Sequence, residues 1–293
     1  MTSQPEAAQA RVSRPAHSSG KIPNTYQNCF SSLGCPDVSL EQVAGLAAEF
    51  EIPCLELRFL KNRADLPALL ADFPGGWKGV ADYLQARGLR TQVLGTSFKL
   101  VGHTTALWQE LLDFAALAEA LHTPYLRAFG GGTWGSALTS EDYQSAAQAL
   151  ALWETERQSR GWQVRLLIET HDAFSASAPC LRLMEVVGRP LDFIWDSHHT
   201  WRLGGESPAE SWRALAPHVR HVHLKDSVGR PSARHPFTYV LPGSGEMPGR
   251  EVLDLLRRDG FAGAVSLEWE KMWHPYLGSL GEALLACGEN HWR

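Results

Sequence analysis

Four acidic or histidine residues lie at the ends of four successive apolar runs in the second half of the chain. The runs LLIE, FIWD, HVHL and VSLE contain a metal-binding type of side chain at Glu169, Asp196, His223 and Glu268. Three carboxylates and one imidazole suit a divalent ion such as Mn²⁺, Mg²⁺, Co²⁺ or Zn²⁺. Because burying these charges without compensation would be costly, the pattern predicts one divalent metal ion held by all four side chains.

Three neighbouring residues are further candidates for this predicted metal site. His221 shares a strand face with His223, since residues two apart in a strand point the same way. His223 lies nearer the C-terminal end of its run and is the preferred ligand. Whether His221, His198 or Glu270 joins the site stays open at this point.

A second set of polar residues lies at or just after the ends of predicted strands, and we expect it to contact the substrate. Its members are His171, His199, Glu56, Arg58, Lys225 and Arg127. Ion pairs around a rim would use the same residue types, so that alternative stays open. No GxGxxG motif opens a helix after the first strand, and the sequence therefore does not predict a dinucleotide site.

The elements that would position these side chains form a repeated pattern of strand followed by helix. Short apolar or β-branched runs predict strands at 24–30, 53–59, 91–96, 124–129, 164–169, 191–196, 219–224 and 264–269. Amphipathic stretches between them predict helices, including 40–50, 104–122, 140–160, 177–187, 208–216 and 250–258. Ser39 and Ser140 are the predicted start signals of two of these helices. Helices of this length between buried strands indicate parallel pairing.

Eight parallel strands with intervening helices predict a (β/α)8 barrel, or TIM barrel, as a single α/β domain. The C-terminal ends of its strands would surround one mouth, where the four predicted ligands meet. An open doubly wound sheet is the alternative. We assign residues 23–293 to the barrel and 1–22 to a flexible N-terminal tail. The Gly- and Pro-rich stretch 227–250 is predicted to be an active-site loop, and DSHH after the sixth strand a short turn.

Charge and composition argue against several classes of protein. The 293 residues carry a formal net charge of −5, which disfavours broad nucleic-acid binding. The five cysteines are an odd number without a CxxC pair, which favours the cytoplasm over a disulfide framework. No apolar run reaches the roughly 18 residues that would suggest a membrane span. The expected partner is a small molecule, and the formation of a homo-oligomer stays open.

Together these motifs carry a resemblance to a known family. ETH at residues 169–171, DSHH, HVHLKD, PGSGE and SLEWE resemble the sugar phosphate isomerase/epimerase group, with the likeness spanning about 24–285. That group has xylose-isomerase-like barrels and includes ketose 3-epimerases, hydroxypyruvate isomerase and inosose dehydratase. The resemblance implies that Glu169 and Glu268 bind the metal and also move the proton, and that His199 is the histidine of the DxxH motif. Where the epimerases usually carry Glu and Arg, this chain has Lys225-Asp226.

The sequence therefore predicts a divalent-metal-dependent isomerase or epimerase of a sugar, a polyol or a related keto or hydroxy compound. The metal would stabilise an enediolate formed when a proton leaves the carbon next to a carbonyl. A lyase or dehydratase acting on a similar substrate is one alternative. A DNA-repair enzyme like endonuclease IV is another, although it would need further metal ligands and a basic face. A non-catalytic binding barrel is the third.

Overall fold

The computed structural model describes residues 25–288 as a closed barrel of eight parallel strands, which confirms the predicted TIM barrel. Around the barrel the strands follow the order β1-β10-β7-β6-β5-β4-β3-β2. Their bounds are β1 Gln27–Ser31, β2 Cys54–Leu57, β3 Arg90–Val101, β4 Tyr125–Gly131, β5 Arg165–Glu169, β6 Asp192–Asp196, β7 Val219–Leu224 and β10 Ala264–Leu267. The predicted tail at 1–22 lies outside the described residues.

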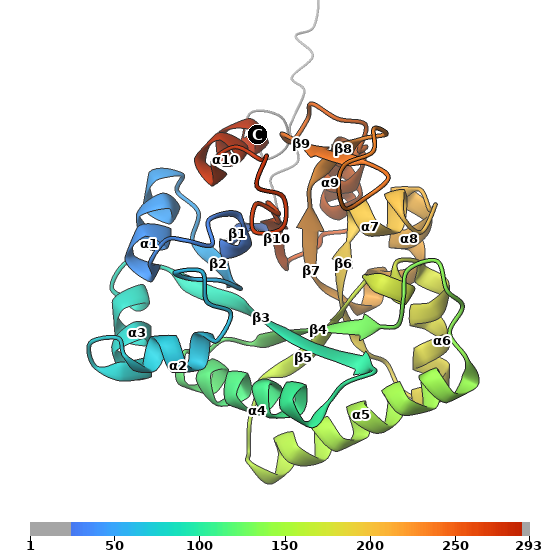
Figure 1. The fold of residues 1–293 in the computed structure, drawn as a ribbon, viewed down its shortest axis with the longest axis horizontal. Helices are drawn as coiled ribbons and strands as arrows, with labels where there is room; N and C mark the ends of the chain where they lie inside the picture. The colour runs from blue at the N-terminus through green and yellow to red at the C-terminus, as the bar shows by residue number, and fades with distance from the viewer. Residues whose placement is uncertain (1–24, 289–293) are drawn as a thin grey trace, which may run out of the picture.

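Helices surround the strands on the outside of the barrel (Figure 1). The α-helices are α1 Leu40–Glu49, α2 Leu66–Ala71, α3 Gly76–Gln85, α4 Thr105–Ala120, α5 Ser140–Ser159, α6 Ser177–Val187, α7 Ser197–Arg202, α8 Pro208–Leu215, α9 Gly249–Arg258 and α10 Leu280–Cys287. Short 3-10 helices are η1 Ser32–Gly34, η2 Asp172–Phe174 and η3 Ala216–His218. The DSHH segment, predicted as a turn, thus begins helix α7.

The helix starts show which local signal decides a boundary. Ser39 is the N-cap of α1, where its hydroxyl accepts a hydrogen bond from Gln42 N at 3.4 Å and the Gln42 side chain accepts one from Ser39 N at 2.9 Å. The N-cap of α5 is Thr139 and not the predicted Ser140. Thr139 lies three residues before Asp142, whose carboxylate accepts a hydrogen bond from Thr139 N at 2.8 Å and completes the capping box.

Apolar side chains fill both the space between strands and helices and the lower part of the barrel interior. Val93, Leu167 and Ile194 form a fully buried cluster inside the barrel. Leu167 and Ile194 lie two residues before Glu169 and Asp196 on the same strands, so their side chains share the inward face one level lower. On β5 and β6 the inward face therefore changes from apolar to acidic toward the C-terminal mouth.

The stretch 227–250, predicted as a loop, contains a small antiparallel hairpin. Strands β8 Asp226–Val228 and β9 Thr238–Val240 pair with each other and not with the barrel. The turn between them, residues 229–237, carries residues that line the central cavity. The prediction that this segment reaches the mouth of the barrel agrees with the structure, and the prediction that it lacks regular structure was wrong.

Asp226 fixes the segment that follows this hairpin. Its carboxylate accepts backbone hydrogen bonds from Ser227 at 2.8 Å, Gly243 at 2.9 Å, Gly245 at 2.8 Å and Met247 at 3.0 Å. A Cβ atom at Gly245 would lie 2.2 Å from the Asp226 Oδ1 atom, so the close approach requires glycine there. Asp226 therefore holds the PGSGE segment in place.

Two further properties follow from the described residues. All five cysteine side chains are buried and free of disulfide bonds. Between residues 25 and 288, no helix has the length and apolar character needed to cross a lipid bilayer.

Candidate metal centre

The four predicted ligands come together at the C-terminal mouth of the barrel. Glu169 and Asp196 end β5 and β6, His223 lies near the end of β7, and Glu268 directly follows β10. One donor atom from each residue lies within 4.8 Å of the donor atoms of the others. Ligand-metal distances of roughly 2.0–2.6 Å allow donor atoms of one ion to lie up to about 5 Å apart. The geometry therefore fits a single ion.

His223 is the centre of this group. Its Nδ1 atom lies 3.2 Å from Glu169 Oε1, 3.2 Å from Glu268 Oε2 and 3.8 Å from Asp196 Oδ2. Burial alone would lower the pKa of His223, but the charges of Glu268 and Glu56 raise it well above its usual value. The surroundings of Nδ1 thus favour a positive charge at this point, whether a proton or a metal ion carries it.

The carboxylates keep their negative charge despite their burial. Burial would raise the pKa values of Asp196 and Glu268, but the neighbouring cations outweigh it, and both values lie well below the ordinary range. The pKa of Asp196 is lowered by the His199 ring and the Lys225 ammonium group, and that of Glu268 by His223 and Lys225. Asp196 Oδ2 is fully buried, and cationic or imidazole nitrogens of Lys225 and His199 lie 2.8 Å and 3.1 Å from it. An ionised carboxylate oxygen is the type of ligand that hard divalent ions prefer.

Lys225, predicted to contact substrate, lies under the cavity against the ligand carboxylates. Its ammonium group is 2.5 Å from Glu268 Oε2, 2.6 Å from Glu270 Oε1 and 2.8 Å from Asp196 Oδ2. Its side chain is almost completely buried. Lys225 therefore balances part of the negative charge of the group and touches two of its four ligands.

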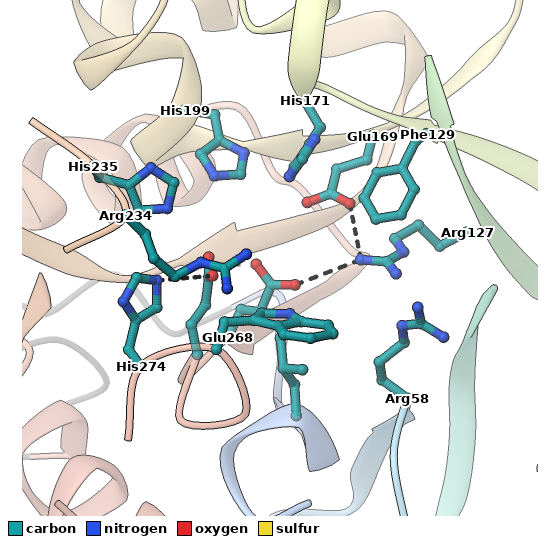
Figure 2. Close-up of a pocket in the computed structure, with 13 residues that line it drawn as sticks. Arg58, Arg127, Phe129, Glu169, His171, His199, Arg234, His235, Glu268 and His274 are labelled. Carbon is teal, nitrogen blue, oxygen red and sulfur yellow. Dashed lines mark hydrogen bonds and ion pairs between the residues drawn. The ribbon is translucent and has the colours of Figure 1, made fainter. Parts of the chain in front are cut away.

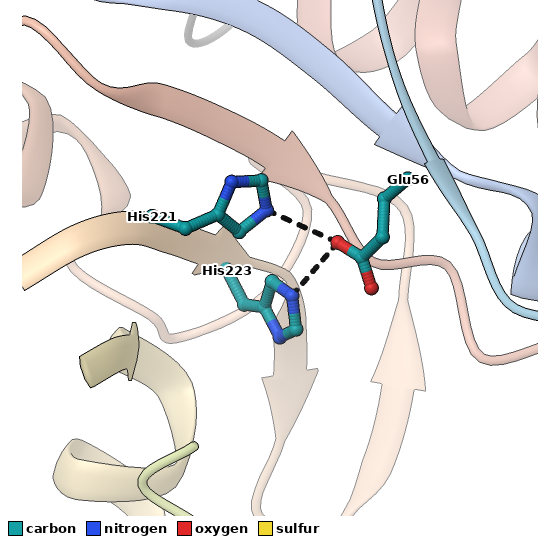
Figure 3. A group of neighbouring side chains, drawn as sticks. All are labelled: Glu56, His221 and His223. Atoms are coloured by element: carbon teal, nitrogen blue, oxygen red, sulfur yellow. Dashed lines mark hydrogen bonds and ion pairs between the residues drawn. The ribbon is translucent and has the colours of Figure 1, made fainter. Parts of the chain in front are cut away.

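Glu56 orients His223 from the side opposite the predicted metal (Figure 3). Glu56 Oε2 lies 2.9 Å from His223 Nε2 and 3.1 Å from His221 Nε2. A carboxylate on one nitrogen of a metal-binding histidine fixes the ring orientation and makes the other nitrogen a better ligand. Glu56 was predicted to touch substrate, but the structure places it below the cavity. His221, left open above, contacts Glu56.

Two other groups of residues also have metal-binding types of side chain. They are Glu56 with His221 and His223, and Asp196 with His198 and His199. Each shares one member with the quartet, so neither is an independent site. His198 Nε2 contacts Ser227 Oγ at 2.8 Å, toward the β8–β9 hairpin. The quartet is the group in which all four donors face one point.

A cavity of about 280 Å³ opens above the quartet (Figure 2). Its lining consists of Leu33, Arg58, Arg127, Phe129, Glu169, His171, His199, Arg234, His235, Glu268, Glu270, Trp273 and His274. Of the four predicted ligands only the two glutamates reach this wall. Arg127 Nη1 lies 3.1 Å from Glu169 Oε2 and 3.8 Å from Glu268 Oε1, so one guanidinium joins the two carboxylates.

The predicted substrate contacts divide into two groups. Arg58, Arg127, His171 and His199 line the cavity, whereas Glu56 and Lys225 do not. His199 Nδ1 lies 3.1 Å from Asp196 Oδ2, and the His171 and His199 rings are 4.8 Å apart. Burial would lower the pKa of His171, but the hydrogen bond to Asp172 and the charge of Glu169 raise it.

Sequence reasoning missed several residues of the cavity wall. Arg234 and His235 come from the turn of the β8–β9 hairpin, and His274 follows β10 by seven residues, counting from Leu267. Phe129 is a β4 residue whose ring lies 4.6 Å from that of His171. Only the Gly- and Pro-rich composition of 227–250 indicated that this segment would reach the mouth.

Residues 44–285 match the family described as xylose isomerase-like TIM barrel, and the chain belongs to that family. This confirms the family resemblance of the motifs. An uncharacterized protein of Mycobacterium tuberculosis is 34% identical over 96 residues, which is 33% of this chain. The match spans 32% of that relative's length.

Solved structures with the same fold include a probable dehydratase, a protein with a bound zinc atom and an epimerase. The probable 3-DHS dehydratase AsbF of Bacillus anthracis has a TM-score of 0.73 at 17% identity, covering 90% of this chain and 99% of that chain. The IolI protein with a bound zinc atom has a TM-score of 0.71 at 17% identity, with 90% and 95% covered. An L-ribulose 3-epimerase has a TM-score of 0.68 at 17% identity, with 90% and 93% covered. At these identities the likeness is one of fold.

Proposed function

We propose that this protein is a divalent-metal-dependent isomerase or epimerase of a small sugar, polyol or related keto or hydroxy compound. The observation that carries the proposal is the division of the quartet by the cavity. Glu169 and Glu268 line the cavity, whereas Asp196 and His223 lie beneath it. Two glutamates can thus face a substrate while four residues hold one ion.

Each residue has a distinct role in this proposal. Asp196 and His223 bind the metal, and Glu169 and Glu268 bind it and also transfer protons. When bound, the ion would supply positive charge that stabilises the negative charge developing on a substrate as it loses a proton. One glutamate removes a proton from the carbon next to a carbonyl. The other returns a proton, to the opposite face of that carbon or to the neighbouring one.

Arg127 prepares the two glutamates for this role. Its guanidinium belongs to the cavity wall and contacts both carboxylates, and its own pKa is raised because the charges of Glu169, Glu268 and Glu56 outweigh its burial. Arg127 therefore remains charged and fixes the positions of the two carboxylates. It is a positioning residue for the pair.

The cavity also restricts the substrate. About 280 Å³ is at the lower limit of ordinary ligand sites, so the occupant is a small molecule. His171, His199 and Glu270 offer hydrogen-bonding groups, while Phe129 and Trp273 supply flat apolar walls. This mixture suits a compound that carries several hydroxyl groups on a short carbon frame.

A dehydratase acting on a similar substrate is the second candidate, and the position of the two glutamates in the cavity wall allows it. One glutamate would remove a proton from the carbon next to a carbonyl. The protonated glutamate would then pass this proton to a departing hydroxyl group, which leaves as water. The fold shared with a probable dehydratase, AsbF, agrees with this candidate. The two reactions differ in their products alone.

The test is a panel of sugars, polyols and keto or hydroxy acids incubated with the protein in deuterated water. We expect one compound to exchange the hydrogen next to its carbonyl, with loss of exchange after chelation and recovery with Mn²⁺, Co²⁺ or Mg²⁺. An isomeric product supports the first candidate, and an unsaturated product one water lighter supports the second. Full activity of chelated protein that contains no metal would exclude both.

A further inference from the structure

Arg58 is a buried cation in the cavity wall that forms no ion pair with an acidic residue among the described residues. Arg127 contacts Glu169 and Glu268, and Lys225 contacts three carboxylates. Arg58 is 7% exposed, and within residues 25–288 no carboxylate oxygen lies within ion-pair distance of its guanidinium. Arg58 therefore has no direct ion pair, whereas the neighbouring buried cations Arg127 and Lys225 each have at least two.

Two neutral groups of β3 hold Arg58 in this place. Its Nη1 donates to Gly95 O at 3.2 Å and its Nη2 donates to Ser97 Oγ at 3.0 Å. The side chain crosses β3 at Gly95, where a Cβ atom would lie only 2.7 Å from Arg58 Cδ. A glycine at this position thus leaves room for the arginine to lie across the strand. The guanidinium is fixed in one orientation before any ligand arrives.

This arrangement is unfavourable in the free protein. Burial, together with the nearby charge of Arg127, lowers the pKa of Arg58 to about 9, and the more distant charges of Glu110, Glu169 and Glu268 only partly oppose this shift. Figure 2 shows both guanidinium groups on the same side of the cavity. A buried charge without a counter-ion costs folding free energy, and two like charges side by side add to that cost. An anion bound in the cavity against Arg58 would reduce this free-energy cost.

We propose that the substrate of this site carries one carboxylate group, and that Arg58 binds it. The inference rests on the proposed function, because it describes the substrate of the same cavity. The substrate is then a keto or hydroxy acid. Its carboxylate lies against Arg58, and its reacting carbon lies between Glu169 and Glu268.

The number of available donors favours a carboxylate over a phosphate. A guanidinium has five N–H groups, and two of those on Arg58 are used by Gly95 and Ser97, which leaves three. Three donors match one planar carboxylate. Among the described residues, the other cation without an acid partner in the cavity wall is Arg234, which is exposed at the rim and lies 5.7 Å from the Trp273 ring. It can attract an anion from solvent without contributing a second buried charge.

The experiment compares each acid with the alcohol that carries a CH2OH group in place of the carboxylate. Glycolate and ethylene glycol, D-glycerate and glycerol, and D-gluconate and D-sorbitol are titrated calorimetrically into the full-length protein, with inorganic phosphate as a further ligand. We expect the acid of at least one pair to bind more tightly than its alcohol. Arg58→Gln should weaken binding of this acid by about 10- to 100-fold and leave the affinity for the alcohol unchanged.

Two other variants keep the test independent of folding defects. Gly95→Ala retains the charge but displaces Arg58, and it should weaken the same acid. Arg87→Gln removes an equal charge from the exposed segment just after α3 and should leave binding intact. Thermal melts followed by circular dichroism establish that each variant is folded.

The outcomes separate this inference from the metal proposal. Titrations are run with metal-loaded and with chelated protein, because carboxylates also bind metals. An acid preference that depends on Arg58 in both forms supports the carboxylate site even if the metal proposal fails. Equal binding of acid and alcohol, an acid preference that survives Arg58→Gln, or tighter binding of phosphate than of every carboxylate would overturn it.

Discussion

The two ends of the barrel contain the same kinds of ion pair in opposite environments. At the mouth, Arg127 pairs with Glu169 at 3.1 Å, and their side chains are 4% and 1% exposed. At the N-terminal end, Arg220 pairs with Asp192 at 2.9 Å, and their side chains are 33% and 15% exposed. Asp192 begins β6 and Asp196 ends it, so a single five-residue strand joins a partly exposed carboxylate to a fully buried one.

This difference shows where the fold gives up stability. Exposed ion pairs contribute about 0–1 kcal/mol and cost little to keep. Buried pairs lose more hydration than their attraction restores, and apolar replacements of similar size are often as stable or more so. The paired charges of the N-terminal end are thus compatible with folding alone. The buried charges of the mouth require another reason, and the metal and proton chemistry proposed above supplies one.

The largest expected effect is on turnover. It should follow replacement of the two glutamates at the mouth and not replacement of an ion-paired carboxylate at the N-terminal end. Glu169→Gln and Glu268→Gln each keep the size and one acceptor oxygen but remove the base. Each should lower turnover by about 10²-fold or more, while some metal remains bound. Asp192→Asn, at the N-terminal end, is the matched control and should retain turnover. Wild-type rates of substrate hydrogen exchange in both glutamine variants would show that the two-glutamate mechanism is wrong.

The second largest effect concerns metal affinity. It distinguishes the ligand His223 from Glu56, which contacts the opposite nitrogen of the His223 ring. Glu56→Gln should weaken Mn²⁺ binding by about 10- to 100-fold, because it removes the carboxylate that orients His223. His223→Ala removes the ligand itself and should weaken binding more. His218→Ala, at the N-terminal end, should leave it unchanged. Equal affinities in Glu56→Gln and wild type, measured by calorimetry, would contradict the role of Glu56.

A smaller effect, on the free energy of unfolding, is expected at Asp226. This buried carboxylate binds backbone N–H groups and is not one of the predicted metal ligands. Each carboxylate oxygen of Asp226 accepts two backbone hydrogen bonds. In Asp226→Asn one of these oxygens is replaced by an NH2 group, which cannot accept hydrogen bonds from the two N–H groups that face it. Urea denaturation should show a loss of about 2 kcal/mol in the free energy of unfolding. An unchanged midpoint would mean that the PGSGE segment is held by other contacts.

The smallest effect belongs to an exposed carboxylate at the N-terminal end. Asp259 accepts a hydrogen bond from Trp212 at 2.8 Å and pairs with Arg258, which lower its pKa to about 2. Because this pKa is depressed, the stabilisation is complete above the unfolded value near 4 and is lost as the pH falls toward 2. Asp259→Asn should lower stability at neutral pH by less than about 1 kcal/mol.

The difference in Tm between Asp259→Asn and wild type should narrow as the pH is lowered through this range. Thermal melts at a series of pH values measure it. A difference that stays constant with pH would show that the hydrogen bond, and not the charge of Asp259, provides the stabilisation.

The fold and the quartet could be predicted from the sequence because both depend on local patterns. Apolar runs separated by amphipathic stretches define the eight units, and strand ends in parallel pairing must meet at one mouth. Glu169, Asp196 and His223 end or nearly end such runs. Glu268 lies one residue past its strand, yet its N–H bonds to Leu224 O at 3.2 Å and continues the ladder. Strand ends alone therefore sufficed for this part of the site.

The rest depends on depth and on distant contacts. Glu56 shares the inward direction of His223, but the stagger of the strands brings it to the back of that ring and away from the cavity. Lys225 was predicted to reach substrate, and its length lets it turn onto Asp196 and Glu268. Arg234 and His235 reach the cavity through a hairpin whose course no local signal describes. The cytoplasmic location stays a prediction from the sequence.

The most direct measurement of the central claim is calorimetric titration of Mn²⁺ into chelated, full-length protein. The quartet predicts one ion per chain in the wild type. The Asp196→Ala/His223→Ala double variant removes the two ligands that do not line the cavity and should bind no ion at the same concentrations. Wild-type protein that binds no Mn²⁺, Co²⁺, Mg²⁺ or Zn²⁺, or a double variant that still binds one ion with wild-type affinity, would contradict the account.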